Sequence, residues 1–500
     1  MKKKLLFLIP LIIISLIYGL LLELSLNTLV GWGIFLAVLL AFIILYFKIL
    51  SEKKLYIKLL SWAAFLLTLF IVYKISYPPY ALTPAVKVKN PEVTDVVSID
   101  QGQLTGVYNA DKTVEVYTGI PYAKAPVGDL RWKEPEDAEG WEGIRTCDHF
   151  APMFMQSENS TLWNSLVSLV IYNHFNWFAP GDNYREAMSE DALYVNIWKP
   201  EGDVSDCPVL FFIHGGSLQT GQPSYDQYNG EAYAKRGIVF VDFGYRLNVF
   251  GYFSDEDLIS ESPNGTTGNY GLLDQIKALE WVNENISAFG GDPGNITIAG
   301  ESAGSSSVNA ICISPLAKGL FRRAIGESSS ICVNTPYHTF RSLSDALKMK
   351  GTVYESMNVS SIEDLRKIDA KTLVKAMGEY NSMTVDGYAI PEQPALIYQK
   401  GENNEEALLS GYNATEADVF TILGTKVDYS NYENILKEKL GDAAEDIIHL
   451  YPAGSDPKEQ YNYIMSAAWF AYSHYTWSRY MADEGRPVYE YWFTKENKGL

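Results

Sequence analysis

Three apolar stretches near the N-terminus constrain the fold of this 500-residue chain more than any other feature. They cover about residues 5–22, 28–47 and 59–77. A helix needs about 20 apolar residues to cross a bilayer, whose interior offers a bare backbone no hydrogen-bond partner. A cleaved secretory leader would explain the first stretch but not the two that follow. We therefore expect residues 1–77 to form a membrane anchor of three transmembrane helices.

Lysine residues around these stretches predict the orientation of the anchor, because basic residues collect on the cytoplasmic side of membrane proteins. Residues 23–27 contain no Lys or Arg, whereas lysines precede the first stretch and separate the second from the third: Lys2, Lys3, Lys4, Lys48, Lys53, Lys54 and Lys58. We therefore expect a multi-pass cell-membrane protein with a cytoplasmic N-terminus and an extracytoplasmic chain after residue 77. No ionisable residue lies in the middle of a stretch, which indicates an anchor rather than a transport pathway.

The composition excludes some classes of partner. The chain has 40 basic and 60 acidic residues, a net charge of −20, which argues against binding to nucleic acid. Its four cysteines, Cys147, Cys207, Cys312 and Cys332, show no metal-ligand spacing, and we expect no dense disulfide framework. Cys312 and Cys332 lie in apolar surroundings, which is typical of buried free thiols. The few cysteines and the lysine-rich N-terminus together indicate a bacterial protein.

After a proline-rich linker over residues 78–97, residues 98–500 follow the pattern of a large α/β domain. Pro208–Ile213 and Ile238–Phe243 are continuous apolar runs, typical of strands that are buried on both faces. A helical pattern spans residues 268–289, and another apolar run follows it. Strands and helices in alternation predict a mostly parallel central sheet with helices on both of its faces.

Other segments carry local signals. For the apolar and aromatic residues 151–188 we favour a helix packed on the core, and the alternative is a lid or pocket rim that touches the membrane surface. Later patterns predict helices over residues 338–380, a turn at 386–387, the start of a strand over 418–423, a helix over 465–481 and a last strand over 487–493.

A candidate nucleophile lies at Gly300-Glu301-Ser302-Ala303-Gly304, between a short β-type run and a helix-compatible segment. The G-x-S-x-G pattern suits a sharp strand-to-helix turn that exposes its serine at the helix N-terminus. A serine hydroxyl is a poor nucleophile unless a base, a group that orients this base and donors for an oxyanion surround it.

Donors for an oxyanion are predicted by His214-Gly215-Gly216-Ser217, which follows an apolar strand. We assign the backbone N–H groups of Gly215 and Gly216, with that of Ala303, to an oxyanion hole. His214 precedes the serine in the chain, against the order of α/β-hydrolases, and we expect it to shape this loop rather than to act as a base.

Together these segments resemble the carboxylesterase type B family, which includes the cholinesterases, and they resemble its bacterial members of the para-nitrobenzyl-esterase type. The resemblance covers residues 98–500 and rests on 119–123, 130–131, 190–197, 208–216, 245–247, 250–251, 268–275, 289–293 and 300–304. It implies an α/β-hydrolase fold and hydrolysis of small-molecule esters through an acyl-enzyme on Ser302. It implies no metal and no organic cofactor.

The resemblance also implies a Ser-Glu-His triad. Gly411–Glu416 matches the turn that carries the acid of the family, which makes Glu416 the acid and leaves Asp418 as a second candidate. Glu301 matches a position that tunes the pocket, and Ser328 matches a buried serine near the triad. Ala192 replaces a cysteine of the cholinesterases, so the disulfide made there is absent and packing alone would hold the segment 151–188.

The histidine of the triad follows the last strand in this family, but none of the six histidines here does. His449 and His474 precede that strand, in predicted helices. Either the triad histidine lies just beyond residue 500, or the chain is a catalytically inactive relative that serves adhesion or recognition. We expect residues 1–500 alone to be inactive or nearly so.

Overall fold

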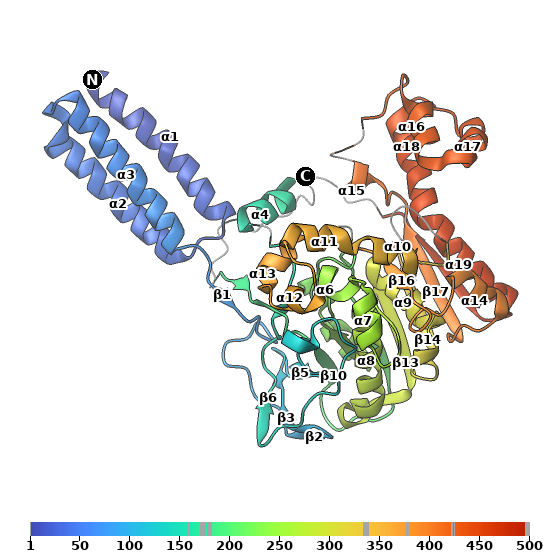
Figure 1. Cartoon of the computed structure of the whole chain (residues 1–500). Helices are drawn as coiled ribbons and strands as arrows, with labels where there is room; N and C mark the ends of the chain where they lie inside the picture. Colours follow the sequence, from blue (N-terminus) through green and yellow to red (C-terminus); the bar gives the residue numbers. More distant parts are fainter. Residues whose placement is uncertain are drawn as a thin grey trace. The chain divides into compact units, whose positions relative to one another are not determined.

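The computed structural model describes residues 2–158, 160–170, 177, 183–333, 340–376, 380–421, 424 and 426–495. It consists of two compact units (Figure 1). Among the described residues, the anchor unit comprises those within 2–82 and 158–187, and the sheet unit comprises those within 83–157 and 188–495. The expected linker is therefore divided at residue 82, and Ala85, just beyond this point, is buried in the sheet unit.

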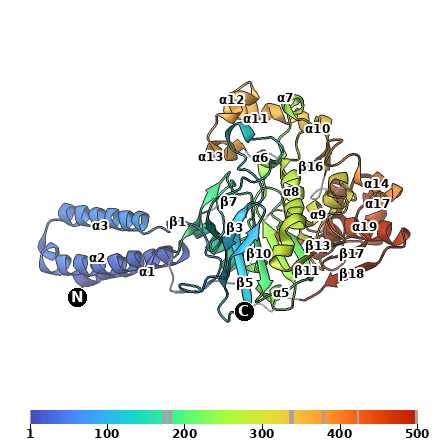
Figure 2. The ribbon, with the colours of Figure 1, turned by 90° about the horizontal axis from the view of Figure 1, so that it is seen from below.

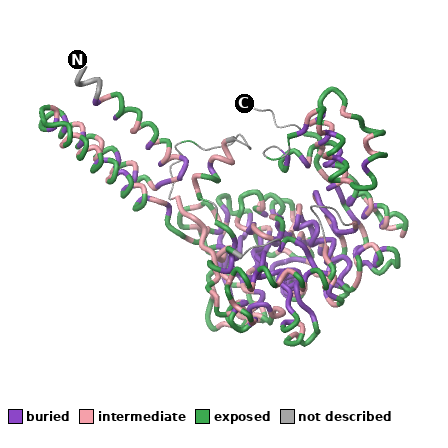
Figure 3. Tube along the Cα trace, turned by 45° about the horizontal axis from the view of Figure 1, so that its top comes forward, coloured by how far each residue is buried: buried purple, intermediate pink, exposed green. Residues whose placement is uncertain are grey.

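Three helices of the anchor unit are long and apolar enough to cross a membrane: α1 (Lys2–Leu24), α2 (Leu29–Lys48) and α3 (Leu55–Ile75). Helix α3 begins at Leu55, four residues before the apolar stretch predicted from residue 59. Its first turn includes Lys58, whose amine donates a hydrogen bond to the Ser51 carbonyl at 2.7 Å. Stacked rings of Phe42 and Phe65, 4.3 Å apart, join α2 to α3. Many other positions of the helices are exposed (Figure 3). Nearly all of the exposed positions carry apolar side chains, as expected of surfaces that face lipid.

The anchor unit also contains helix α4 (Thr161–Val170) and a short parallel pair, β1 (Tyr80–Ala81) with β8 (Arg185–Glu186). The hydroxyl of Thr161 donates a hydrogen bond to the Ser25 carbonyl at 2.8 Å. The favoured prediction for this segment, a helix on the core of the sheet, is therefore wrong, because α4 packs with α1. Residues 159, 171–176 and 178–182 of the segment lie outside the described residues.

A nine-stranded sheet forms the centre of the sheet unit, in the order β18–β17–β14–β13–β11–β12–β10–β5–β4. Six neighbouring strands are parallel, and β10, β5 and β4 continue the sheet antiparallel at one edge. The strands are β4 (Val107–Tyr108), β5 (Val114–Pro121), β10 (Tyr194–Pro200), β11 (Cys207–Ile213), β12 (Val239–Phe243), β13 (Gly291–Glu301), β14 (Arg323–Glu327), β17 (Ala407–Asn413) and β18 (Val488–Phe493). This mostly parallel sheet confirms the predicted fold class.

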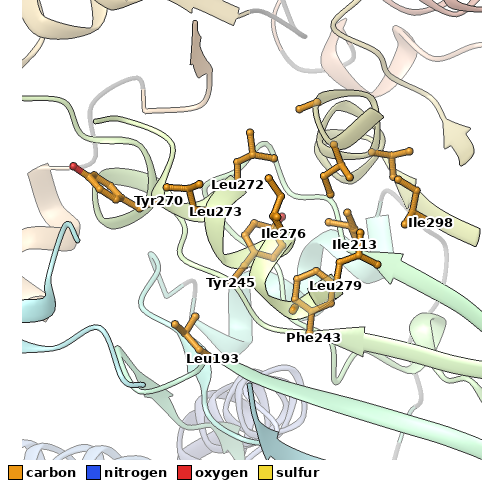
Figure 4. Close-up of a cluster of buried hydrophobic side chains, with 14 of the residues drawn as sticks. Leu193, Ile213, Phe243, Tyr245, Tyr270, Leu272, Leu273, Ile276, Leu279 and Ile298 are labelled. Carbon is orange, nitrogen blue, oxygen red and sulfur yellow. The ribbon is translucent and has the colours of Figure 1, made fainter. Parts of the chain in front are cut away.

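Side chains of β11 alternate between two cores. Val209, Phe211 and Ile213 belong to the large core beneath α8 (Tyr270–Asn285) and α9 (Ala303–Ile313), whereas Leu210 and Phe212 face a smaller core under α5 (Glu231–Ala234). Figure 4 shows residues of α8 packed with side chains of the sheet. Helices therefore cover both faces (Figure 2), as the continuous apolar strands predict.

The remaining helices are short. They are α6 (Asn248–Tyr252), α7 (Glu256–Glu261), α10 (Leu343–Lys348), α11 (Lys350–Met357), α12 (Ile362–Arg366), α13 (Ala370–Leu373), α14 (Pro394–Lys400), α15 (Asp418–Thr421), α16 (Tyr432–Leu440), α17 (Ala444–Leu450), α18 (Pro457–Ser466) and α19 (Tyr472–Asp483). Small sheets pair β2 (Val97–Ile99) and β6 (Ile144–Thr146) with β3 (Gly102–Thr105), β7 (Met153–Phe154) with β9 (Met188–Ser189), and β15 (Phe340–Ser342) with β16 (Met383–Val385).

One predicted strand is absent. The apolar residues after Asp418 predict the start of a strand, but residues 418–421 form helix α15, and residues 422–423 lie outside the described residues. The ring of Phe420 stacks on Phe470, 5.8 Å away, so it packs on a helix rather than in the sheet. The strand of this region, β17, ends five residues earlier at Asn413.

The four cysteines are free, and all but the half-buried Cys207 are buried, including Cys312 and Cys332. Within the described part of the chain, no group of His, Cys, Asp and Glu side chains could hold a metal ion.

Candidate active site

Ser302 lies at a sharp turn between β13 and α9. Its backbone has φ 55° and ψ −125°, a region that residues with a side chain rarely adopt. Its N–H donates to the Glu327 carbonyl at 2.8 Å, so the end of β14 holds the turn in place. The half-buried side chain stands at the N-terminus of α9, where backbone N–H groups without helical partners favour negative charge.

The two glycines of the motif allow close contacts around this turn. A Cβ at Gly300 would lie 2.4 Å from the Gly304 carbonyl carbon, and a Cβ at Gly304 would lie 2.0 Å from the Ile213 oxygen. Both distances are too short for any side chain, because the opposing atoms belong to the backbone. The first turn of α9 therefore rests directly on the end of β11.

The loop after β11 reaches the candidate nucleophile. A Cβ at Gly215 would lie 3.1 Å from the Cβ of Ser302, so the backbone of this glycine passes beside the serine. Gly216 has φ 109°, and a Cβ there would lie 2.1 Å from the Thr220 oxygen. Glycine is therefore required twice, for a close approach and for a left-handed backbone.

His214, the first residue of this loop, is packed against Tyr245 and contacts the backbone of Gly215. Its Nδ1 lies 2.8 Å from the Gly215 carbonyl oxygen, its ring stacks on Tyr245, and the hydroxyl of Tyr245 donates to the His214 carbonyl at 2.8 Å. Burial lowers the pKa of His214 to about 4. A neutral imidazole whose Nδ1–H donates to a carbonyl fits the structural role expected for this histidine.

Half-buried carboxyl groups lie next to the candidate nucleophile. Glu301 pairs in register with Glu327 of the neighbouring strand, and its Oε2 would lie 2.8 Å from a Cβ at Gly215. The pKa of Glu301 is raised to about 7, first by burial and then by the charges of Glu416 and Glu327. Burial also raises the pKa of Glu327.

Glu416 lies after β17, in the turn that its sequence predicts. Its Oε1 accepts hydrogen bonds from the N–H and the side-chain amide of Asn413, at 2.8 and 3.0 Å. The same amide lies 3.4 Å from the hydroxyl of Ser328, which is buried and has φ 59°. The structure thus brings Ser328 and Glu416 together through Asn413. Asp418 instead accepts from Asn462 at 2.7 Å and is exposed.

The described histidines lie in four different places. His149 is exposed beside Asp148, His449 is exposed on α17, and His214 lies under the oxyanion loop. His474 is buried in α19, where its Nδ1 bonds to the hydroxyl of Ser410 at 2.6 Å. His174 and His338 lie outside the described residues.

Sequence reasoning missed three residues at this site. Glu327 is the last residue of β14, the strand next to β13, which leads to the candidate nucleophile. Its position at the end of a predicted neighbouring strand is the signal that could have revealed it. Tyr491 lies on β18, and its ring fills the space over Gly411, where a Cβ would be 2.3 Å away. Burial raises the pKa of Tyr228, and the charge of Glu301 adds to the rise. The position of neither tyrosine follows from a local motif.

The conformation of Ser302 predicts a difference in stability between two variants that lack its hydroxyl. Relief of backbone strain favours Ser302→Gly over Ser302→Ala, although glycine loses more entropy on folding, and we expect a net gain of about 1 kcal/mol in unfolding free energy. Chemical denaturation of the two full-length proteins measures this difference. An alanine variant as stable as the glycine variant would contradict the strained turn.

The environment of Glu301 predicts a pH-dependent stability. Its pKa in the folded protein lies above the ordinary value of 4.5, so folding is favoured while the carboxyl is protonated, and stability is lost as the pH rises through about 7. We expect the unfolding free energy of Glu301→Gln, measured relative to that of the parent, to rise by at most about 3 kcal/mol when the pH is raised from 5 to 8. Urea unfolding of both proteins at pH 5 and at pH 8 measures this change. The same difference between variant and parent at both pH values would refute the raised pKa of Glu301.

Comparison with known proteins agrees with this architecture. Residues 93–500 match the sequence model of the carboxylesterase family. Fumonisin B1 esterase of Sphingopyxis macrogoltabida is 33% identical over 71% of the chain and 63% of its own length. Para-nitrobenzyl esterase of Bacillus subtilis is 32% identical over 71% of the chain and 70% of its own length. The chain thus spans less than two thirds of the first of these relatives.

A solved structure extends the comparison to the fold. The carboxylesterase Est55 of Geobacillus stearothermophilus superposes with a TM-score of 0.68 and 33% identity, over 81% of each chain. Its similarity confirms the α/β-hydrolase fold predicted for residues 98–500. The chain belongs to the carboxylesterase family.

Proposed function

We propose that this protein is a serine carboxylesterase that hydrolyses small-molecule esters through an acyl-enzyme. The observation that carries the proposal is the half-buried Ser302, held in a strained turn with the Gly215 backbone beside it. A structural turn has no need of a strained, accessible serine at a helix N-terminus. Family membership and the two esterase relatives support the same chemistry.

In the first step, Ser302 Oγ attacks the ester carbonyl and gives up its proton to a general base. The carbonyl oxygen becomes an oxyanion, which accepts hydrogen bonds from the backbone N–H groups of Gly215, Gly216 and Ala303. The C–O bond to the alcohol then breaks, and the base returns the proton to the leaving oxygen. Water attacks the acyl-enzyme by the same route and releases the acid.

We assign the base to a histidine beyond residue 500, in the continuation of the segment that follows β18, because residues 494–500 contain none. Strand β18 is parallel to β17, and the Ala414 N–H donates to the Phe493 carbonyl at 3.0 Å. The chain therefore leaves the sheet close to the turn that holds Glu416. A histidine delivered there could receive a hydrogen bond from Ser302 on one ring nitrogen and donate to Glu416 from the other.

The charges around Ser302 indicate the class of ester. Glu301 and Glu327 lie at the ends of the strands that form the turn, and Glu416 is close enough to influence Glu301. Three carboxyl groups disfavour an anionic substrate, because like charges repel strongly in a partly desolvated site. Neutral or apolar esters fit this site best.

The anchor unit supports a location at the cell membrane. Three helices are long and apolar enough to span it, and the lysines between α2 and α3 favour a cytoplasmic position for that loop. We propose a cytoplasmic N-terminus and an extracytoplasmic sheet unit.

Substitution of the two proposed triad residues tests the reaction. In a chain that carries the histidine proposed beyond residue 500, we expect Ser302→Ala to lower kcat for p-nitrophenyl esters on the order of 10⁶-fold, and Glu416→Gln on the order of 10³–10⁴-fold. Asp418→Asn is the matched control, because this exposed carboxylate lies two residues further along, and we expect little change. Equal losses in the Glu416 and Asp418 variants would contradict the assignment of the acid.

Chemical labelling of intact cells tests the orientation. With Cys207 replaced by serine, the remaining cysteines are buried, and Lys53→Cys or Asp203→Cys adds one accessible thiol. We expect a membrane-impermeant maleimide to label position 203 in intact cells and position 53 only after lysis. The reverse pattern would invert the proposed topology.

A further inference from the structure

Helix α4 has two chemically distinct faces. Its sequence, Thr-Leu-Trp-Asn-Ser-Leu-Val-Ser-Leu-Val, places the polar residues Thr161, Asn164, Ser165 and Ser168 at the spacing of one helical stripe. The other described positions carry only apolar side chains, and Trp163 among them is 53% exposed. No charged residue occurs between Glu158 and the end of the helix. Such a helix requires an apolar surrounding on one side.

The polar stripe begins against the polar end of the three-helix bundle. The Thr161 hydroxyl donates to the Ser25 carbonyl, and the Thr161 N–H donates to the Tyr77 hydroxyl at 3.3 Å. Ser165 is buried. Because Ser25 and Tyr77 lie where α1 ends and where the chain leaves α3, this contact marks the level at which the anchor helices end.

A set of buried hydrogen bonds defines the same level. The side-chain amide of Asn27 donates to the Tyr73 carbonyl and to the Ser76 hydroxyl, each at 2.8 Å, and the Thr28 N–H donates to the Ser76 carbonyl. The turn between α1 and α2 is therefore tied to the end of α3. Polar groups of this kind are expected where the hydrocarbon region gives way to the headgroups.

Both ends of the segment that contains α4 are fixed to the chain just after α3. The guanidinium of Arg185 lies 4.8 Å from the Tyr77 ring and 3.8 Å from the Tyr80 ring, and its Nε donates to the Pro78 carbonyl at 2.8 Å. Glu158 accepts from Arg185 at 3.2 Å and from the Tyr80 hydroxyl at 2.5 Å. These contacts hold α4 at the end of the bundle.

We propose that α4 is an interfacial helix, with its apolar face, centred on Trp163, inserted at the boundary between headgroups and acyl chains of the leaflet at which α1 and α3 end. The proposal rests on the membrane location proposed for the anchor, with which this surface is continuous. Tryptophan is enriched at this depth, because its ring is apolar and its N–H seeks a partner. The occupant of this surface is then lipid rather than a protein partner.

Depth-dependent fluorescence quenching tests the inference. The full-length protein with Cys207→Ser and Trp163→Cys is placed in phosphatidylcholine vesicles. An environment-sensitive dye is attached to the cysteine at position 163. Two reference positions accompany it. Leu36→Cys lies on an exposed apolar face of α2, and Asp203→Cys lies on the surface of the sheet unit. Quenching by nitroxide lipids is compared with quenching by aqueous iodide.

We expect the dye at position 163 to be quenched several-fold more by shallow nitroxide lipids than the dye at position 203, and several-fold less by iodide. Strong iodide quenching at position 163, with lipid quenching intact at position 36, would overturn the inference and leave the anchor standing. Protection from both quenchers would show that protein covers α4 and would also overturn it. If the dye at position 36 escapes lipid quenching, the proposed membrane anchor fails and this inference with it.

Discussion

The close contact between the first turn of α9 and the end of β11 is the constraint on which the site depends. With only 2.0 Å available for a Cβ at Gly304 against the Ile213 oxygen, these two elements touch through their backbones. This contact brings the loop after β11 beside Ser302 and turns the serine into its strained conformation. The proposed oxyanion loop and the proposed nucleophile are thus placed by the same packing, so we expect a change in one to disturb the other.

Parallel strands extend this arrangement sideways. Strands β11, β13, β14 and β17 are neighbours in this order, and their carboxyl ends lie at the same end of the sheet. The proposed oxyanion loop follows β11, Ser302 follows β13, Ser328 follows β14 and Glu416 lies after β17. The same geometry gathers carboxyl groups that water cannot fully solvate. Burial and mutual repulsion raise the pKa of Glu301 to about 7, so this side chain carries little charge in mildly acidic solution. A neutral Glu301 would interfere less with the oxyanion that we propose to form at Gly215.

Much of this site could be predicted from the sequence, because its parts are local. The G-x-S-x-G turn, the paired glycines after β11 and the turn before Glu416 each occupy a few consecutive residues. Glu327 and Tyr491 depend on strand order and register, which no local pattern records. The same limit explains two errors in the fold. The apolar residues after Asp418 pack on a helix rather than in the sheet, and α4 packs with α1, far from it in sequence.

The most direct test of the account is the identity of the residue that reacts with an active-site phosphonate. A chain that carries the histidine proposed beyond residue 500 would be treated with a fluorophosphonate, digested and analysed by mass spectrometry. The strained turn, the oxyanion loop and the triad together predict a single adduct on the peptide that contains Ser302. A protein that remains unlabelled, or that carries its adduct on another serine, would contradict the account.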